Sequence, residues 1–155
     1  MESREPDRTS ADPHPDLRSL GVQLRRLNGE LNRLVHGFAA GEGLHPTDVQ
    51  ALAAILDSAD PLTPSALRHR LGLTSGAVSA CVDRLERAGH VNRVRESADR
   101  RVVHLHYVPG AQARARQYFG PLAGATDRVR SGYSDSELAV VLRFLGDLNE
   151  ELAQT

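Results

Sequence analysis

Serines, arginines and small side chains that could contact DNA are concentrated in the middle third of the chain. A short helix fits residues 64–71, and after a tight Gly72-Leu73 turn Thr74 can serve as the N-cap of a second helix, residues 75–88. Two helices connected in this way form a helix-turn-helix, and the second helix fits the major groove of DNA. This segment therefore predicts recognition of nucleic acid.

Two alternating apolar segments, residues 91–95 and 102–108, predict a β-hairpin with a charged tip. An arginine at such a tip can enter a narrow, electronegative minor groove. Asp99 stands two residues before Arg101 and could hold its guanidinium, because pairing between Arg and a carboxylate is directional. The alternative is an exposed turn with an ordinary surface ion pair.

The second helix has one apolar face and one face of small or weakly polar side chains. Small side chains let a helix lie deep in the major groove, where Ser can bond to base edges and an Ala methyl can contact a thymine methyl. Arg84 and Arg87 follow about a turn later and suit phosphate contacts. The alternative is a solvated face on which Asp83 and Arg87 form an ion pair. The candidate DNA-binding residues are Ser65, Thr74, Ser75, Gly76, Ala77, Ser79, Ala80, Arg84, Arg87, Asp99, Arg100 and Arg101.

The distribution of charge favours a nucleic-acid partner, although the 155-residue chain has a net charge of only −1. Residues 63–108 hold eight arginines and four carboxylates, whereas the rest of the chain holds 11 arginines and 16 carboxylates. A basic segment within an acidic chain is typical of a DNA-contacting region. A general use of Arg in place of Lys on the surface is the simpler alternative.

The composition argues against an enzyme and against a membrane or secreted protein. All 19 basic residues are Arg, so a phosphate-binding loop or a Schiff base that depends on Lys cannot form, and GxSxG, HExxH and CxxC motifs are absent. A single Cys suits a reducing cytoplasm, and no apolar run is long enough for a signal peptide or a membrane span. We therefore expect a cytoplasmic protein with no cofactor and no bound metal.

Heptad seams mark both ends of the chain, after a polar, proline-rich arm at residues 1–15 that we expect to be disordered. In residues 17–38 and 138–152, apolar side chains recur at alternating steps of three and four. Such seams demand burial, either against each other in one chain or between two chains, and we favour a homodimer. The predicted dimerisation residues are Leu17, Leu20, Leu24, Leu27, Leu138, Val141, Leu145 and Leu148.

The predicted fold is mainly α, of the α+β class: a winged helix-turn-helix with a helical dimerisation region formed by the N- and C-terminal helices. We expect one domain over residues 16–155, in which residues 46–108 bind DNA and residues 16–38 and 109–153 form the dimerisation helices. A Gly-rich break at residues 41–43 would end the first helix. A helix over 46–58 would follow it. Later in the chain, Pro109 suits a first helical turn, and Ser134 with Glu137 forms a capping box.

The chain resembles the MarR family of winged helix-turn-helix regulators (multiple antibiotic resistance regulators) from about Asp16 to Leu152. The strongest part is LRHRLGLTSGAVSACVDRLERAGHVNRVRESADRRVVHLHYVPGA. Within it, VDRLERAGHVNR resembles the recognition helix and the following strand, DRR the wing, and PGA the start of a dimerisation helix. The resemblance implies a homodimer that represses or activates at a pseudo-palindromic operator.

By this resemblance, Arg101 is the minor-groove arginine and Asp99 its brace, and the small residues 75–80 face bases or phosphates. The sequence departs from the family pattern at Ala80, where Arg is frequent, and this puts one DNA contact in doubt. It also departs at Cys81, where Leu is common, and this resembles variation in the core. Tyr107-Val108 stands in place of Leu-Thr, and this resembles variation at the end of a strand.

Three groups of residues could sense a signal. Cys81 is the only thiol, but it lies on an apolar face, where a free Cys usually behaves as a small hydrophobe. His104 and His106 share a strand face, yet no carboxylate or Cys completes a metal site. His36 and His45 flank the Gly-rich loop, near where the family binds small effectors; a solvated loop histidine is the alternative for each.

The sequence as a whole predicts a cytoplasmic, homodimeric, DNA-binding transcription regulator that responds to a ligand and acts as a repressor. Its expected partners are double-stranded DNA, a second copy of itself and a small-molecule effector. The competing hypothesis is a winged-helix module that binds proteins and not DNA. Strongly salt-dependent binding to duplex DNA would separate the two.

Overall fold

The computed structural model describes residues 16–95 and 102–154 and confirms the mainly helical class. The predicted arm at residues 1–15 and the hairpin tip at 96–101 lie outside the described residues. The elements, in chain order, are α1 (Leu17–Glu42), α2 (Pro46–Leu56), α3 (Pro64–Leu71), α4 (Ser75–Arg87), β1 (Val91–Arg95), β2 (Val103–Tyr107), α5 (Pro109–Arg130) and α6 (Asp135–Ala153).

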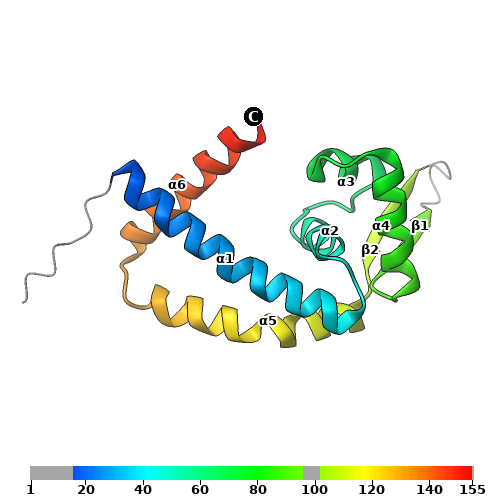
Figure 1. The fold of residues 1–155 in the computed structure, drawn as a ribbon, viewed down its shortest axis with the longest axis horizontal. Helices are drawn as coiled ribbons and strands as arrows, with labels where there is room; N and C mark the ends of the chain where they lie inside the picture. Colours follow the sequence, from blue (N-terminus) through cyan, green and yellow to red (C-terminus); the bar gives the residue numbers. More distant parts are fainter. Residues whose placement is uncertain (1–15, 96–101, 155) are drawn as a thin grey trace, which may run out of the picture.

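Figure 1 shows two parts of the molecule that meet where α1 ends and α5 begins. We call residues 46–107, which form α2, α3, α4, β1 and β2, the head. We call residues 17–42 and 109–153, which form α1, α5 and α6, the stalk. In the view of Figure 1, α4 and the two strands lie at the end of the head that points away from the stalk.

The helix-turn-helix forms where the sequence predicts it, because local side chains and one glycine fix its turn. α3 ends at Gly72, whose φ of 63° lies in the left-handed region that favours glycine. Thr74 Oγ1 then accepts a hydrogen bond from the N–H of Ala77 at 3.2 Å, which starts α4 as expected.

The hairpin is attached to the rest of the head by one backbone contact. β1 and β2 pair antiparallel, with Val91 opposite Tyr107 and Arg95 opposite Val103. The N–H of Leu105 donates to the carbonyl oxygen of Leu62 at 2.8 Å. The connection before α3 therefore pairs with β2 through a single antiparallel bridge. The strand predicted at 102–108 is one residue shorter at each end.

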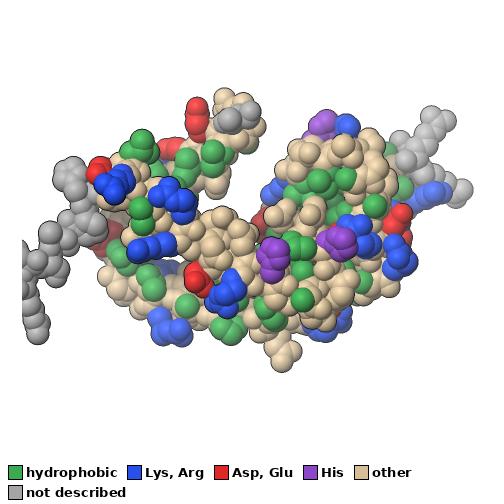
Figure 2. All heavy atoms as spheres, viewed as in Figure 1, with side chains coloured by type: hydrophobic (Ala, Val, Ile, Leu, Met, Phe, Trp, Pro, Cys, Tyr) green, Lys and Arg blue, Asp and Glu red, His purple; other side chains and the backbone are tan. Residues whose placement is uncertain are grey.

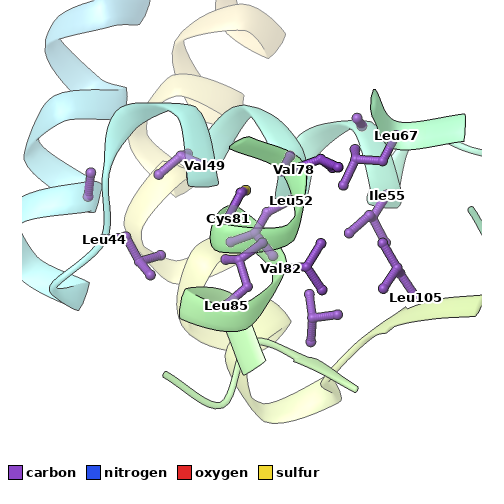
Figure 3. Close-up of a cluster of buried hydrophobic side chains, with 14 of the residues drawn as sticks. Leu44, Val49, Leu52, Ile55, Leu67, Val78, Cys81, Val82, Leu85 and Leu105 are labelled. Carbon is purple, nitrogen blue, oxygen red and sulfur yellow. The ribbon is translucent and has the colours of Figure 1, made fainter. Parts of the chain in front are cut away.

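The core lies in the head and receives a buried apolar side chain from each of its elements (Figure 3). Val82 and Leu85 from α4 point toward the side chains of α2 and β2, while the opposite face of α4 is turned away from the core. Each fully buried Leu or Val contributes about 1.5–3 kcal/mol relative to an exposed one. The core therefore fixes which face of α4 can meet a partner.

Two helices, α1 and α2, end at other residues than the sequence predicts. α1 continues through Gly41 and Glu42, which were expected to break it, and ends at Gly43 with a φ of 66°. The N–H of Gly43 closes the last turn onto the carbonyls of α1, so only the third residue of the Gly-rich run acts as a stop signal. α2 ends at Leu56 rather than at residue 58, and α5 is one helix through Pro121.

An aromatic cluster joins α1 to α5 at the base of the head. Phe38 lies 5.2 Å from Tyr118 and 5.3 Å from Phe119, measured between ring centroids, and Phe38 is almost fully buried. Gly37 admits the Tyr118 ring, because a Cβ at position 37 would lie 2.3 Å from the Tyr118 hydroxyl. This cluster is the apolar joint between stalk and head.

Away from that joint, the stalk buries little of its apolar surface within one chain. α6 has no buried residue, and Val129 of α5 is 63% exposed. Hydrophobic side chains are visible on the stalk surface in Figure 2. In residues 16–95 and 102–154, no helix is both long and apolar enough to cross a membrane.

Candidate DNA-binding surface

The N-terminal half of α4 presents the small-residue face that the sequence predicts. Its side chains from Ser75 to Ala80 are exposed except for Val78, which is packed in the core. Ser79 Oγ donates a hydrogen bond to the carbonyl oxygen of Ser75 at 2.9 Å. Because its proton is used inside the helix, the Ser79 oxygen is oriented to accept a bond from a base or a water molecule.

A shallow cleft of about 330 Å³ runs between the N-terminal turns of α3 and α4. Ser65 from α3 and Ser75 from α4 lie on its two sides, and Arg68 supplies a positive charge. Hydroxyls and a guanidinium around one hollow can bind a phosphate oxygen. The sequence-based list contains both serines but omits Arg68, which the i,i+3 spacing from Ser65 on one helix face could have indicated.

The Arg84 side chain is paired with a buried carboxylate of the head. Its Nε donates to Asp48 Oδ2 at 3.0 Å and its Nη2 to Asp48 Oδ1 at 2.7 Å, and Asp48 is fully buried. Such a two-point pair is strong and directional. We predicted a phosphate contact for Arg84, but its guanidinium is directed at α2 and we no longer include it among the DNA contacts.

The electrostatics around Asp48 follow from this pairing. Burial by itself raises the pKa of the Asp48 carboxyl, but hydrogen bonds from Arg84, the His45 backbone and Cys81 together hold it below its usual value of 3.8. Asp48 therefore stays ionised in the core. The pairing partner of Asp48 lies 36 positions away in the sequence, which is why local spacing did not reveal the pair.

The ion pair on the outer face of α4 differs from the Asp83–Arg87 pair that was the alternative to a DNA-binding face. Asp83 pairs with Arg93 of β1, whose Nη2 lies 2.6 Å from Asp83 Oδ1, and not with Arg87. The other terminal nitrogen of Arg93 donates to Glu86. Arg93 thus neutralises two carboxylates of α4 that would otherwise repel DNA phosphates, and it braces the wing strand against the helix.

A second charged cluster joins the head to both long helices of the stalk. His90, fully buried just after α4, has its Nε2 3.0 Å from Glu42 Oε2. Arg114 of α5 donates to the same oxygen from Nη2 at 3.2 Å. Desolvation lowers the pKa of His90 below its usual 6.5, with Arg114 also lowering it and Glu42 opposing the change. None of these three residues was proposed from the sequence.

The candidate sensor residues separate into a buried and an exposed group. Burial raises the pKa of the Cys81 thiol to about 12, and hydrogen bonding to Asp48 contributes to the same shift. Among the residues that the structure describes, no group of three His, Cys, Asp or Glu side chains could hold a metal ion. His36 and His45 are both exposed, and the backbone N–H of His45 donates to Asp48 at the start of α2.

An apolar cavity of about 280 Å³ lies between stalk and head, but neither His36 nor His45 lines it. Among the described residues that line the cavity, Gln50 is the one with an amide side chain, and none is charged. The sequence did not indicate this cavity, because its wall is assembled from four elements. The lining residues are Val35, Phe38, Val49, Gln50, Leu52, Ala53, Leu56, Tyr107, Ala115 and Phe119.

The remaining predicted site residues are Asp99, Arg100, Arg101, Arg87 and the eight predicted dimerisation residues. Asp99, Arg100 and Arg101 fall outside the described residues. Arg87 is exposed in the last turn of α4. Within one chain, five of the predicted dimerisation residues are exposed and three are partly buried. The exposed ones are Leu17, Leu20, Leu27, Val141 and Leu145, and the others are Leu24, Leu138 and Leu148.

The head is a winged helix-turn-helix with its second helix free on one face, an architecture that binds DNA in many regulators. A MarR family model matches residues 42–102. The HTH-type transcriptional regulator YcgE of Bacillus subtilis (strain 168), named as uncharacterized, is 37% identical over 140 residues, which cover 88% of this chain and 90% of YcgE. The chain belongs to the MarR family.

Two further similar proteins agree with this assignment. The HTH-type transcriptional repressor YetL of Bacillus subtilis (strain 168) is 27% identical over 135 residues, covering 86% of this chain and 81% of YetL. The crystal structure of Streptococcus pneumoniae FabT in complex with DNA superposes with a TM-score of 0.64 at 26% identity, covering 90% of this chain and 99% of FabT. The predicted family and fold are therefore confirmed.

Proposed function

We propose that this protein is a sequence-specific transcription regulator that binds a pseudo-palindromic DNA operator as a homodimer. The observation that carries the proposal is the exposed face of small and hydroxyl side chains at the start of α4, held outward by the buried face of the same helix. This face fits the floor of a major groove. Two such helices would enter successive grooves, about 34 Å apart.

The proposed dimer interface is the unburied apolar surface of the stalk. A hollow of about 470 Å³ at the corner of α5 and α6 is lined mainly by apolar side chains, among them Val129, Leu138 and Val141. Exposed apolar surface of this extent marks an interaction site, because water contact with it is unfavourable. A second copy of the stalk supplies the complementary helices under two-fold symmetry.

The proposed DNA contacts are those of the sequence-based list, with one exchange. Arg68 enters because it lines the cleft between α3 and α4, and Arg84 leaves because it pairs with Asp48. Arg101 at the wing and its brace Asp99 are retained on the family resemblance. Repression is the proposed direction of control, by analogy with YetL, whose name states that activity.

The test is selection of a duplex by the purified protein from a randomised library, followed by titration at several salt concentrations. Arg101→Ala should weaken binding to the selected duplex by about 1–3 kcal/mol and leave the fold unchanged. Asp99→Ala should produce part of the same loss, because it releases that side chain. If no duplex is selected, or if binding does not depend on salt, the protein-binding alternative gains support.

We further propose that a small molecule with a mostly apolar or aromatic body controls this binding from the cavity between stalk and head. The lining of that cavity favours an apolar body, because the described residues that form it are apolar apart from Gln50. A ligand can act there only by binding one arrangement of the head better than another. Titration into free and duplex-saturated protein tests this, since equal affinities would exclude control by that molecule.

A further inference from the structure

Two carboxylates flank residues 43–45, the corner that connects α1 of the stalk to α2 of the head. Glu42 is the last residue of α1, and Asp48 lies in the first turn of α2. Only residues 43–45 separate the two helices, and Gly43 makes the turn with its left-handed backbone. The corner is therefore short, and both carboxylates have nearly fixed positions relative to α1.

Both carboxylates hold the C-terminal part of the DNA-recognition helix α4. Asp48 binds Arg84 in the last turn of α4, and Glu42 contacts His90, which directly follows the turn that ends α4. Arg114 of α5 reaches the same Glu42 oxygen, so the second stalk helix is connected to this point as well. The C-terminal end of α4 is thus held at Arg84 by a two-point pair, and His90, just beyond the helix, is contacted by Glu42 from the same corner.

These contacts restrict rotation in a way that the apolar core does not. Asp48 accepts two hydrogen bonds from Arg84 and one from the His45 backbone at 2.9 Å, and each bond has a preferred direction. Apolar packing is non-directional, and cores accept small shifts of one element over another. A helix held by directional bonds at its rear keeps a defined angle to the stalk.

We propose that Asp48 and Glu42 are positioning residues that set the angle of α4 relative to the stalk, and thereby the distance between the two recognition helices of the dimer. This inference rests on the proposed function, because only a dimeric DNA reader has such a distance. Neither carboxylate contacts DNA in this arrangement. Arg84 acts through Asp48 and is likewise a positioning residue.

The experiment uses the duplex that the unmodified protein selects, together with versions in which one base pair is inserted or removed between the half-sites. Affinities of the full-length protein for all three duplexes are measured, with the salt dependence for the selected one. The variants are Asp48→Asn, Arg84→Gln and Glu42→Gln. Asp57→Asn and Glu30→Gln serve as matched controls, because they remove exposed carboxylates at the end of α2 and within α1.

We expect Asp48→Asn to weaken binding to the selected duplex about tenfold and to reduce its preference over the altered spacings. Glu42→Gln should have a smaller effect of the same kind, and the controls should have none. The salt slope should be unchanged in Arg84→Gln, because no phosphate contact is lost. A slope reduced by about one would mean that Arg84 binds a phosphate, and would overturn the inference.

The variants also differ in how much they disturb the fold. Asp48→Asn leaves a charged Arg84 against the core, so unfolding of this variant is a foreseeable result, and circular dichroism will detect it. In that case the double variant Asp48→Asn with Arg84→Gln, together with Glu42→Gln, decides the question. Folded variants that retain the full spacing preference overturn the inference. If the unmodified protein selects no duplex, the proposed function itself fails and the inference fails with it.

Discussion

The head and the stalk differ in how much of their apolar side-chain surface they bury within one chain. Among residues 16–95 and 102–154, fifteen large hydrophobic side chains are exposed, and two of them, Leu56 and Val94, belong to the head. The head instead contains nearly all of the buried core, and α6 at the end of the stalk contains no buried residue. The head buries its apolar side chains within one chain, whereas the stalk leaves apolar side chains exposed, which in the proposed dimer a second chain would cover.

The charged residues show the same contrast. In the head and at its junction, Asp48, Arg84, His90 and Arg93 all make specific pairs with other elements. Within the stalk, Arg114–Glu42 joins α1 to α5 next to the head, whereas the pairs Arg33–Glu30 and Arg130–Asp127 lie on single helices and are well exposed. Exposed pairs of that kind contribute about 0.3–0.5 kcal/mol, so they do not fix how the stalk helices pack.

The largest effect is expected when charged side chains replace exposed leucines of the stalk, because this tests whether the stalk is a dimer interface. Leu27→Glu combined with Leu145→Glu should abolish the dimer, because burial of unpaired carboxylates in an apolar interface is strongly unfavourable. Both side chains are at least 37% exposed in one chain, so the monomer itself loses little. Analytical ultracentrifugation should show a monomer, and binding to the selected duplex should be lost.

A control for this pair is Gln23→Glu with Asn149→Glu, which adds the same charge at exposed polar positions of α1 and α6. This control should remain dimeric. A folded dimer of Leu27→Glu with Leu145→Glu and unchanged DNA affinity would mean that the heptad seams do not form the interface.

The next largest effect compares one leucine from each part. Leu85→Ala removes a fully buried side chain of the head and should lower the free energy of unfolding by about 2–5 kcal/mol. Leu142→Ala changes a side chain of α6 that is 70% exposed in one chain. If the stalk is a dimer interface, the stability that Leu142→Ala loses relative to the unmodified protein should depend on protein concentration.

Urea unfolding at two protein concentrations measures both variants. For Leu85→Ala, the difference from the unmodified protein should be the same at both concentrations. A loss for Leu142→Ala that is equally independent of concentration would place that side chain on ordinary monomer surface.

The sequence predicted those features of the fold that depend on local chemistry. Thr74 and Ser134 cap their helices as expected, and Gly72 ends α3, because each acts on backbone groups within a few residues. The outward face of α4 was also predictable, since the buried positions follow the helical period. Gly41 misled the prediction because glycine is tolerated inside a helix that packing holds together.

The parts of the site that the sequence did not reveal are long-range pairs. Arg84 has the spacing of a phosphate contact, and only the approach of α2 shows that Asp48 binds it. In the same way, His90 follows a helix-ending glycine and resembles a loop residue, yet it is fully buried and contacts Glu42 of α1. Such pairs depend on tertiary packing, for which one sequence contains no periodic signal.

A third prediction concerns the buried His90 and the pH dependence of the free energy of unfolding. Desolvation lowers the pKa of His90 below 6.5, Arg114 adds to that shift, and Glu42 opposes it. Below about pH 6.5 the unfolded chain therefore binds a proton that the folded chain does not. The free energy of unfolding should fall as the pH decreases, by at most about 1.4 kcal/mol per pH unit, until the folded-state pKa is reached.

The check is to compare the unmodified protein with His90→Gln between pH 7 and the acid range in which carboxylates titrate. The slope of unfolding free energy against pH should be smaller in His90→Gln, whatever its absolute stability. His69→Gln, which changes an exposed histidine of the head, is the control and should retain the slope. Equal slopes in all three proteins would show that the junction does not respond to protons.

The smallest expected effect concerns Cys81, whose reactivity reports how often the core of the head opens to solvent. Its thiol is buried beside Asp48, and its pKa is raised to about 12 from a usual 9.0, so the reactive thiolate is about a thousandfold scarcer at neutral pH. A thiol reagent should leave the native protein unlabelled, while an Ala113→Cys variant should react at its exposed position on α5. Hydrogen peroxide should likewise leave the affinity for the selected duplex unchanged. Rapid labelling of Cys81 would mean that the head opens far more readily than its packing indicates, because only local unfolding could expose the thiol.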